Sequence, residues 1–474
     1  MRVSFVDVVG RIPDGRLRTL FARPAETFDS ILTSGDDRSV SQRIALIAFA
    51  TRVVSAAIAY FSQVVMARWM GDFQYGVFVV VWVGSVIMGG IAGMGVQVAV
   101  LRFVPEYRAK GELDLLRGVI LGSRLQGLAT STVVALAGFA GLYAFGDHIS
   151  GTYLVPLYLG AVTLPILAVG EIQEGLARSF NWANLALWPT YIVRPLLILV
   201  FMGAALWLGA KPDAVTAMAS VVAATYLTAV GQFVGLEGAI GKTVPRGPRQ
   251  YRAMLWITVA VPIFVVEGFF NLLTNVDILV VGRLMTPERV AVYFAAVKTM
   301  ALVHFVYFSV RAGSAQRFSQ YYAAGDTARL SAFVRDTLHW TFWPSLAMVA
   351  VLIVVGRFLL ALFGPRFVEG YPVLLILSVG LLLRASIGPA ETLLIMAGQQ
   401  GITAVVYVAA FFLNVALNFS LIPYFGINGA AVATAIALGA ETLVLYVLVR
   451  GRLSINCSIL TVLKPPPPGA VEAG

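Results

Sequence analysis

The stretch LIPYFGINGAAVATAIA, residues 421–437, shows the unit from which this fold is built. Pro423 lacks a backbone donor and is predicted to end one helix, and Gly426 permits a tight turn. The small residues from Gly429 to Ala437 let the next helix approach its neighbours closely. The stretch therefore predicts two closely packed helices joined by a very short turn.

The same apolar pattern recurs along the whole chain. Of the 474 residues, 59% are hydrophobic and 12% are charged, whereas a soluble globular protein carries roughly 25% charged residues. The hydrocarbon core of a bilayer is crossed by about 20 apolar residues of helix. We therefore predict an all-α integral membrane protein with about 12 transmembrane helices, at residues 44–66, 76–100, 119–145, 152–171, 182–208, 213–237, 253–281, 290–310, 336–356, 371–397, 402–422 and 426–449.

Basic residues orient this array. With the N-terminus in the cytoplasm, the inner segments hold 23 Lys or Arg residues and the outer loops hold six, as the positive-inside rule requires. Both termini are therefore predicted to be cytoplasmic, and the net charge of +10 is a topology signal and not a nucleic-acid site. We predict a cytoplasmic extension at 1–43, a linker at 241–252 and a tail at 453–474. The single cysteine, Cys457, excludes an internal disulfide and a cysteine-based metal cluster, and no metal or other cofactor is predicted.

An internal repeat divides the predicted helices into two sets of six. Segments 215 residues apart match one another: Ala67-Arg68-Trp69-Met70 with Gly282-Arg283-Leu284-Met285, Gly76-Val77-Phe78 with Ala291-Val292-Tyr293, and Arg102-Phe103 with Arg317-Phe318. An even number of helices separates the copies, so they share one orientation in the membrane. We predict two six-helix lobes, 44–240 and 253–452, related by a parallel repeat, with a substrate path between them.

Charged residues inside the predicted helices are candidates for the substrate site, because a charge at mid-bilayer costs about 2.5–3.5 kcal/mol. The candidate cavity bases are Arg52, Arg194, Lys298 and Arg384. The candidate polar and ion-coupling residues are Glu267, Asn271, Asn275, Asp277 and Glu391. We expect a water-filled cavity with a modest positive bias; the alternative is interhelical hydrogen bonds and ion pairs such as Arg384–Glu391.

The chain resembles a known family of transporters. Residues 421–437 resemble the C-terminal signature of polysaccharide-biosynthesis flippases, and Asp277, the stretch 290–298 and Leu362-Phe363-Gly364 support the likeness. The family is the Wzx-like branch of the multidrug/oligosaccharidyl-lipid/polysaccharide exporter superfamily. The resemblance implies a flippase for undecaprenyl-diphosphate-linked oligosaccharides in the bacterial inner membrane, with basic cavity residues on the diphosphate. A polysaccharide polymerase or export complex is the implied protein partner.

Three alternatives remain open at this stage. A cation-coupled multidrug antiporter of the same superfamily would favour an acidic cavity, to which Glu267 and Asp277 would contribute. A lipid II flippase would share the diphosphate-linked lipid as cargo. A membrane enzyme of polysaccharide assembly would need a sizeable loop for a sugar donor, and no predicted loop is large enough. We therefore predict a transporter and not an enzyme.

Overall fold

The computed structural model describes the backbone of residues 37–462 and most side chains from Val54 to Leu460. The chain divides into two compact units, Met1–Ala59 and Tyr60–Gly474. The first unit contributes the beginning of one helix, and the second contains all later elements. The described residues form helices and no strand. The predicted N-terminal extension up to residue 36 and the segment Lys464–Pro468 lie outside the described residues.

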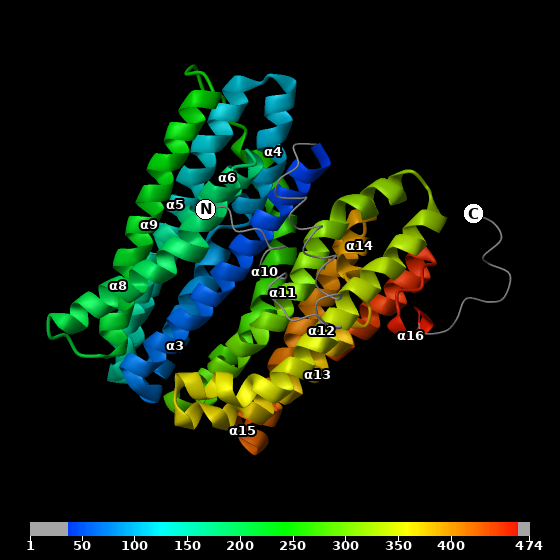
Figure 1. Cartoon of the computed structure of the whole chain (residues 1–474). Helices are drawn as coiled ribbons and strands as arrows, with labels where there is room; N and C mark the ends of the chain where they lie inside the picture. Colours follow the sequence, from blue (N-terminus) through cyan, green and yellow to red (C-terminus); the bar gives the residue numbers. More distant parts are fainter. Residues whose placement is uncertain (1–36, 463–474) are drawn as a thin grey trace, which may run out of the picture. The chain divides into compact units, whose positions relative to one another are not determined.

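The helices follow the predicted order in both halves (Figure 1). The first half contains α3 Asp37–Ala92, α4 Val96–Lys110, α5 Leu113–Phe145, η1 Gly146–His148, α6 Gly151–Ser179, α7 Ala183–Trp188, η2 Pro189–Val193, α8 Arg194–Trp207 and α9 Ala214–Thr243. The second half contains α10 Ala253–Leu284, α11 Pro287–Ala323, α12 Thr327–Phe363, η3 Pro365–Gly370, α13 Tyr371–Ala385, α14 Ala390–Met396, α15 Gln400–Leu453 and α16 Ile459–Val462.

Ten helices among the described residues are long and apolar enough to cross a membrane, and two of them reverse direction at a glycine. Gly71 in α3 has φ 73°, and Gly426 in α15 has φ 59°; both lie in the left-handed region that favours glycine. The Asn414 amide lies 3.3 Å from the Thr434 hydroxyl, although a straight helix would separate residues 20 apart by about 30 Å. The ten helices thus supply twelve crossing segments, the number that the sequence predicts.

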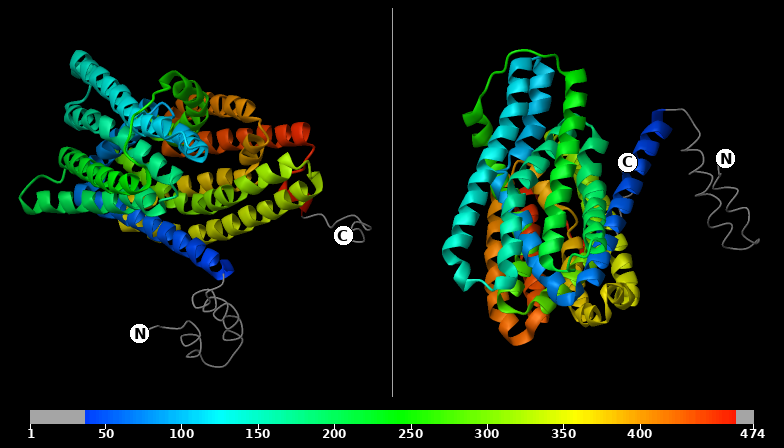
Figure 2. Two further views of the ribbon diagram at one scale, coloured as in Figure 1. Left: turned by 90° about the horizontal axis from the view of Figure 1, so that it is seen from above. Right: turned by 90° about the vertical axis from the view of Figure 1, so that its left-hand side faces the viewer.

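Within the second unit the helices form two lobes. The helices α4 to α9 pack with one another, and so do α10 to α15. In Figure 1 and in the left view of Figure 2, the cyan and green helices of the first lobe gather on one side of the yellow and orange helices of the second. This arrangement confirms the predicted two-lobe helical fold.

Three hydrophobic cores show how the lobes meet. One large core joins residues of both lobes near the turns at Gly71, Met285 and Gly364, where Tyr75 of α3 and Phe294 of α11 are buried together. We call this the closed end. At the opposite end, which we call the far end, a second core around Phe103 is formed mainly by the first lobe and includes Trp256 and Ala260 of α10. The second lobe has a separate core there, around Phe318.

The placement of the repeat agrees with its predicted parallel symmetry. The segments that end at Met70 and at Met285 both precede a turn at the closed end. Phe103 and Phe318, the matched residues of the two Arg-Phe pairs, are 3% and 1% exposed in the two separate cores of the far end. Matched residues thus lie at the same end of the two lobes.

Candidate functional site

A cavity of about 460 Å³ lies between the lobes. Its walls come from α3, α4, α6, η2, α8 and α9 of the first lobe and from α10 of the second. A volume of this size falls in the range of ligand sites, about 300–1,000 Å³. The polar and charged side chains in the lining are Gln97, Glu171, Glu174, Arg178, Thr190, Tyr191, Arg194, Thr225, Thr228, Gln232, Glu267, Asn271 and Thr274.

Arg194 is the predicted cavity base that the lining contains. It is the first residue of α8, directly after the π-helical turn Pro189–Val193, and such turns occur frequently at functional sites. Its guanidinium carbon lies 5.6 Å from the centre of the Trp82 ring. Among the described residues no carboxylate lies within 4 Å of it. Arg194 therefore presents a charge to the cavity without a direct acidic partner.

Two glutamates of α6 were missed by the sequence prediction. The predicted helix ends at residue 171, whereas α6 continues to Ser179, and Glu171 and Glu174 both line the cavity. Glu174 forms an ion pair with Arg178 one turn later. With Glu267 the lining holds three acids against two arginines, so the expected positive bias is absent. A helical wheel continued past the hydrophobic stretch would have placed both glutamates on the face of Gly170.

Neutral hydrogen-bonding groups form much of the first-lobe wall. The Gln97 Oε1, Thr225 Oγ1 and Thr228 Oγ1 atoms are buried and have no hydrogen-bond partner among the described residues. All three residues line the cavity. Most buried polar atoms in proteins have a partner, so these three atoms are unpaired acceptors in the wall beside the cavity.

Some of the candidate polar residues in the predicted span 253–281 line the cavity, and others do not. Glu267 and Asn271 of α10 line the cavity. Asn275 does not, and its amide instead donates to the Asn271 side-chain and backbone oxygens at 2.8 and 3.0 Å. Leu273 of the same helix is buried in an apolar cluster with Tyr407. Glu267, Asn271 and Thr274 of α10 therefore reach the cavity, and Asn275 does not.

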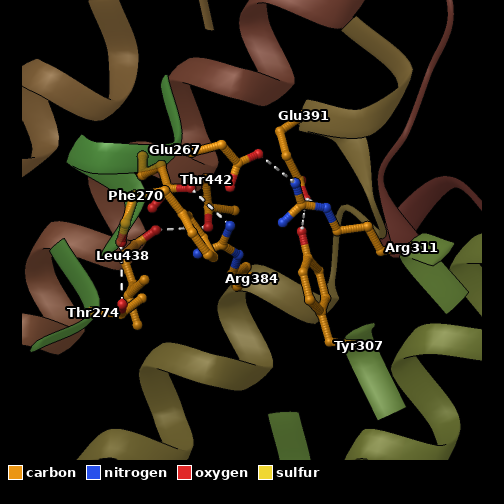
Figure 3. A network of polar contacts seen from close by, with 10 residues as sticks. Glu267, Phe270, Thr274, Tyr307, Arg311, Arg384, Glu391, Leu438 and Thr442 are labelled. Carbon is orange, nitrogen blue, oxygen red and sulfur yellow. Dashed lines mark hydrogen bonds and ion pairs between the residues drawn. The ribbon is translucent and has the colours of Figure 1, made fainter. Parts of the chain in front are cut away.

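Arg384 and Glu391 lie in a buried polar network of the second lobe (Figure 3) and not in the cavity lining. Arg384 pairs with Glu441 at 3.2 Å and not with Glu391, the partner named in the alternative of interhelical ion pairs. A pairing between residues seven apart needs an unbroken helix, but the helix stops at Ala385 and resumes at Ala390. Gly388 in the break has φ 60°, which turns the two side chains in different directions.

Arg311 links the cavity to this network, as Figure 3 shows. Its guanidinium lies 3.9 Å from the cavity residue Glu267 and 3.8 Å from Glu391. Tyr307, on the same helix, donates a hydrogen bond to Glu391. The prediction missed Arg311 by one residue, because the eighth span was taken to end at 310.

Asp277 lies in a second buried polar cluster, at the contact of α10, α11 and α15. Tyr293 donates to its Oδ2 at 2.5 Å, and Thr434 lies 3.4 Å from the same atom. Asn414 neighbours Thr434, and the Oδ1 atom of Asn418 has no partner in the part of the chain that the structure describes. Carboxylate, amide and hydroxyl oxygens are ligands that hard cations take. These oxygens are candidates to hold a small cation.

Of the remaining predicted bases, one lies away from the cavity and the side chain of the other is outside the described residues. Lys298 is half-buried, with its ammonium 4.9 Å from the centre of the Phe294 ring, and it does not line the cavity. The side chain of Arg52 lies outside the described residues. Arg194 is therefore the predicted base on which the site can be built.

Comparisons with known proteins agree with this geometry. Residues 262–420 match the MatE family model. The chain is 22% identical over 404 residues to the "Probable low-salt glycan biosynthesis flippase Agl15" of Haloferax volcanii, a match that covers 83% of this chain and 80% of that protein.

Two solved structures share the fold. An inward-facing multidrug resistance MATE family transporter of the MOP superfamily matches with a TM-score of 0.67 and 16% identity, over 86% of this chain and 98% of that one. The lipid II flippase MurJ in an inward closed conformation matches with a TM-score of 0.67 and 15% identity, over 85% and 87%. The fold is that of this superfamily. These structures are of a transporter and a flippase, in agreement with the prediction of a transporter and not an enzyme.

Proposed function

We propose that the chain is a flippase that moves an undecaprenyl-diphosphate-linked oligosaccharide across the bacterial inner membrane by alternating access. The product would supply polysaccharide biosynthesis, such as O-antigen, exopolysaccharide or capsule. The observation that carries the proposal is the set of unpartnered Gln97, Thr225 and Thr228 oxygens in the cavity wall. A sugar offers hydroxyl donors to such acceptors at several positions.

Arg194 is the base that we assign to the diphosphate. Arginine binds phosphate oxygens through its planar fork of donors, and Arg194 lines the cavity without a carboxylate within 4 Å. Arg178 lines the same cavity but is held by Glu174. Arg384 is held by Glu441. Arg194 is therefore the described basic lining residue that has no carboxylate partner within 4 Å.

The packing of the lobes is that expected of one state in an alternating-access cycle. Both lobes share a single core at the closed end, while at the far end the core of the first lobe takes in α10 of the second, and the second lobe has a separate core around Phe318. If both termini are cytoplasmic, as the charge distribution predicts, the far end faces the cytoplasm. The structure then corresponds to a state closed toward the outside, ready to take up substrate made in the cytoplasm. We assign ion coupling to the Asp277 cluster.

A cation-coupled multidrug antiporter is the second candidate. The observation that favours it is the carboxylate content of the lining, with Glu171, Glu174 and Glu267. Carboxylates attract organic cations and repel a diphosphate, so the two functions predict opposite effects of neutralising them. No comparable observation on the described residues favours a membrane enzyme of polysaccharide assembly.

Deletion of the gene tests the proposal directly. A flippase deficiency should cause a lipid-linked oligosaccharide to accumulate on the cytoplasmic face, where it can be extracted and identified. Purified protein in liposomes should move that lipid across the bilayer. The double variant Glu171→Gln/Glu174→Gln should retain or increase this transport. Efflux of a cationic dye that is lost in the double variant, with no lipid translocation, would establish the antiporter instead.

A further inference from the structure

The segment that joins the two lobes carries an uncompensated basic surface. Lys242, Arg246, Arg249 and Arg252 are all exposed, and we call them the linker bases. No acidic residue occurs between positions 238 and 266. None of the linker bases forms an ion pair with a described residue. Their charges are therefore not compensated by an acidic residue in the described part of the chain.

The linker is held in place by the first lobe. Arg117 of α5 donates to the backbone oxygens of Pro245 and Pro248 at 2.8 and 3.1 Å. The backbone N–H of Gln250 donates to the backbone carbonyl oxygen of Asp114 at 2.9 Å. A Cβ atom at Gly118 would lie 1.8 Å from the Gln250 oxygen, so this contact requires glycine. The linker bases are therefore presented from a fixed backbone.

Exposed apolar side chains accompany the linker bases. Tyr251 is 51% exposed, and Met254 and Leu255, in the first turn of α10, are 78% and 44% exposed. Trp256, the next residue, is buried and donates to the Tyr107 hydroxyl at 3.0 Å, which fixes the rotation of this turn. The exposed residues and the linker bases thus share one short surface at the far end of α10.

We propose that the linker bases bind the headgroups of anionic phospholipids while Tyr251, Met254 and Leu255 insert into the adjacent interface. Basic residues next to a membrane-crossing helix are attracted to anionic lipid surfaces, and aromatic side chains favour the headgroup level. A nucleic acid would leave the exposed apolar side chains without a partner. The bound lipid anchors the first lobe at the linker, which is the covalent joint between the two lobes.

Native mass spectrometry of the full chain in detergent tests this site. The probes are phosphatidylglycerol and phosphatidylcholine of equal chain length, each added alone. We expect the wild-type chain to bind phosphatidylglycerol at least tenfold more tightly. The triple variant Arg246→Gln/Arg249→Gln/Arg252→Gln should lose at least tenfold in this affinity, since each base near an anionic surface contributes about fivefold.

The control variant Arg317→Gln/Arg329→Gln/Arg335→Gln removes the same charge from exposed residues of α11 and α12, where Arg329 pairs with Asp326. This control variant should lose less than twofold in affinity for phosphatidylglycerol, and both triple variants should unfold at the wild-type temperature. Met254→Ser/Leu255→Ser should weaken binding of both lipids. Equal affinity of the wild type for the two lipids, or an equal loss in both triples, would overturn the proposal. Displacement of the lipid by millimolar inorganic phosphate would show a free-anion site and would also overturn it.

Discussion

Arg366 donates to the Asp72 carboxylate at 2.7 Å, and this ion pair joins the two halves of the chain at the closed end. Asp72 follows the turn at Gly71, and Arg366 lies in η3 after α12. Arg68 strengthens the junction by donating to the Leu362 and Ala361 backbone oxygens at 2.6 and 2.9 Å. These contacts must break when the closed end opens.

Neutralising the pair should therefore favour opening of the closed end. Arg366 is exposed and Asp72 is half-buried, and ion pairs near the surface contribute little, so Asp72→Asn or Arg366→Gln should shift the population of the open state no more than about fivefold. The measurement is the labelling rate of a cysteine at Val292, which is buried at this end. The swap Asp72→Arg/Arg366→Asp should restore slow labelling. A swap that labels as fast as the single variants would show that the pair does not act as a gate.

The Arg384–Glu441 pair gives a prediction about stability. Both residues are buried, and removing one partner of a buried pair leaves an unpaired charge at a cost of about 3–5 kcal/mol. Arg384→Gln should lower the unfolding temperature and the amount of protein in the membrane. The double variant Arg384→Gln/Glu441→Gln should recover most of both. The matched double Arg384→Gln/Glu391→Gln should not recover, because Glu391 is bonded to Tyr307 and Arg311; recovery there would contradict the assignment.

The sequence predicts the helices well because lipid imposes their length. The turn at Gly426 and the twelve crossing segments follow from runs of about 20 apolar residues. Hydropathy indicates which residues lie in the hydrocarbon core of the bilayer, but it does not indicate where a helix ends. For this reason it missed Glu174, on the extension of α6, and Arg311, one residue beyond the predicted span.

The partners of the embedded charges could not be read from helical spacing. The spacing of Arg384 and Glu391 assumed an unbroken helix, whereas the chain leaves helical geometry between Ser386 and Pro389. The Ser386 oxygen accepts from the Ile459 N–H at 2.9 Å, a contact between segments 73 residues apart in the sequence. Such a break depends on tertiary packing, and so does the choice of Glu441 as the partner of Arg384.

Asp277 should control the ion dependence of transport. If its cluster binds the coupling cation, Asp277→Asn should abolish the response of transport to an imposed Na⁺ or proton gradient in liposomes. Thr434→Val should weaken the response, because Thr434 lies 3.4 Å from the carboxylate. Glu369→Gln, in an exposed ion pair with Arg289, is the matched control and should respond normally. If transport by Asp277→Asn still responded fully to the imposed gradient, the coupling cation would have to bind at another site.

Cys457 should be inert to thiol reagents in the folded protein. It is 1% exposed, and burial raises the pKa of its thiol to about 12. At pH 7 only roughly one molecule in 100,000 would carry the reactive thiolate, and this fraction rises as the pH approaches the pKa. The wild-type chain should therefore label with a polar maleimide only after unfolding.

This inertness makes the predicted topology testable. In a Cys457→Ser background, a cysteine at exposed Lys242 should label only from the cytoplasmic side. A cysteine at exposed Lys211 should label from outside. Labelling of Lys242→Cys from outside intact cells would reverse the predicted orientation of the whole array.

Arg194 gives the most direct test of how the substrate is held. A hydrogen bond to a charged group contributes about 1.5–3 kcal/mol, so Arg194→Gln should reduce transport of the lipid-linked oligosaccharide at least tenfold at unchanged protein level. Arg194→Lys keeps the charge but loses the planar fork, and it should recover part of the activity. Arg289→Gln removes an exposed base outside the cavity lining and should transport normally. If Arg194 had only a structural role, the amount of Arg194→Gln protein in the membrane would fall together with its transport. Normal transport by Arg194→Gln would mean that the diphosphate is held by other groups and that the site has been assigned to the wrong wall of the cavity.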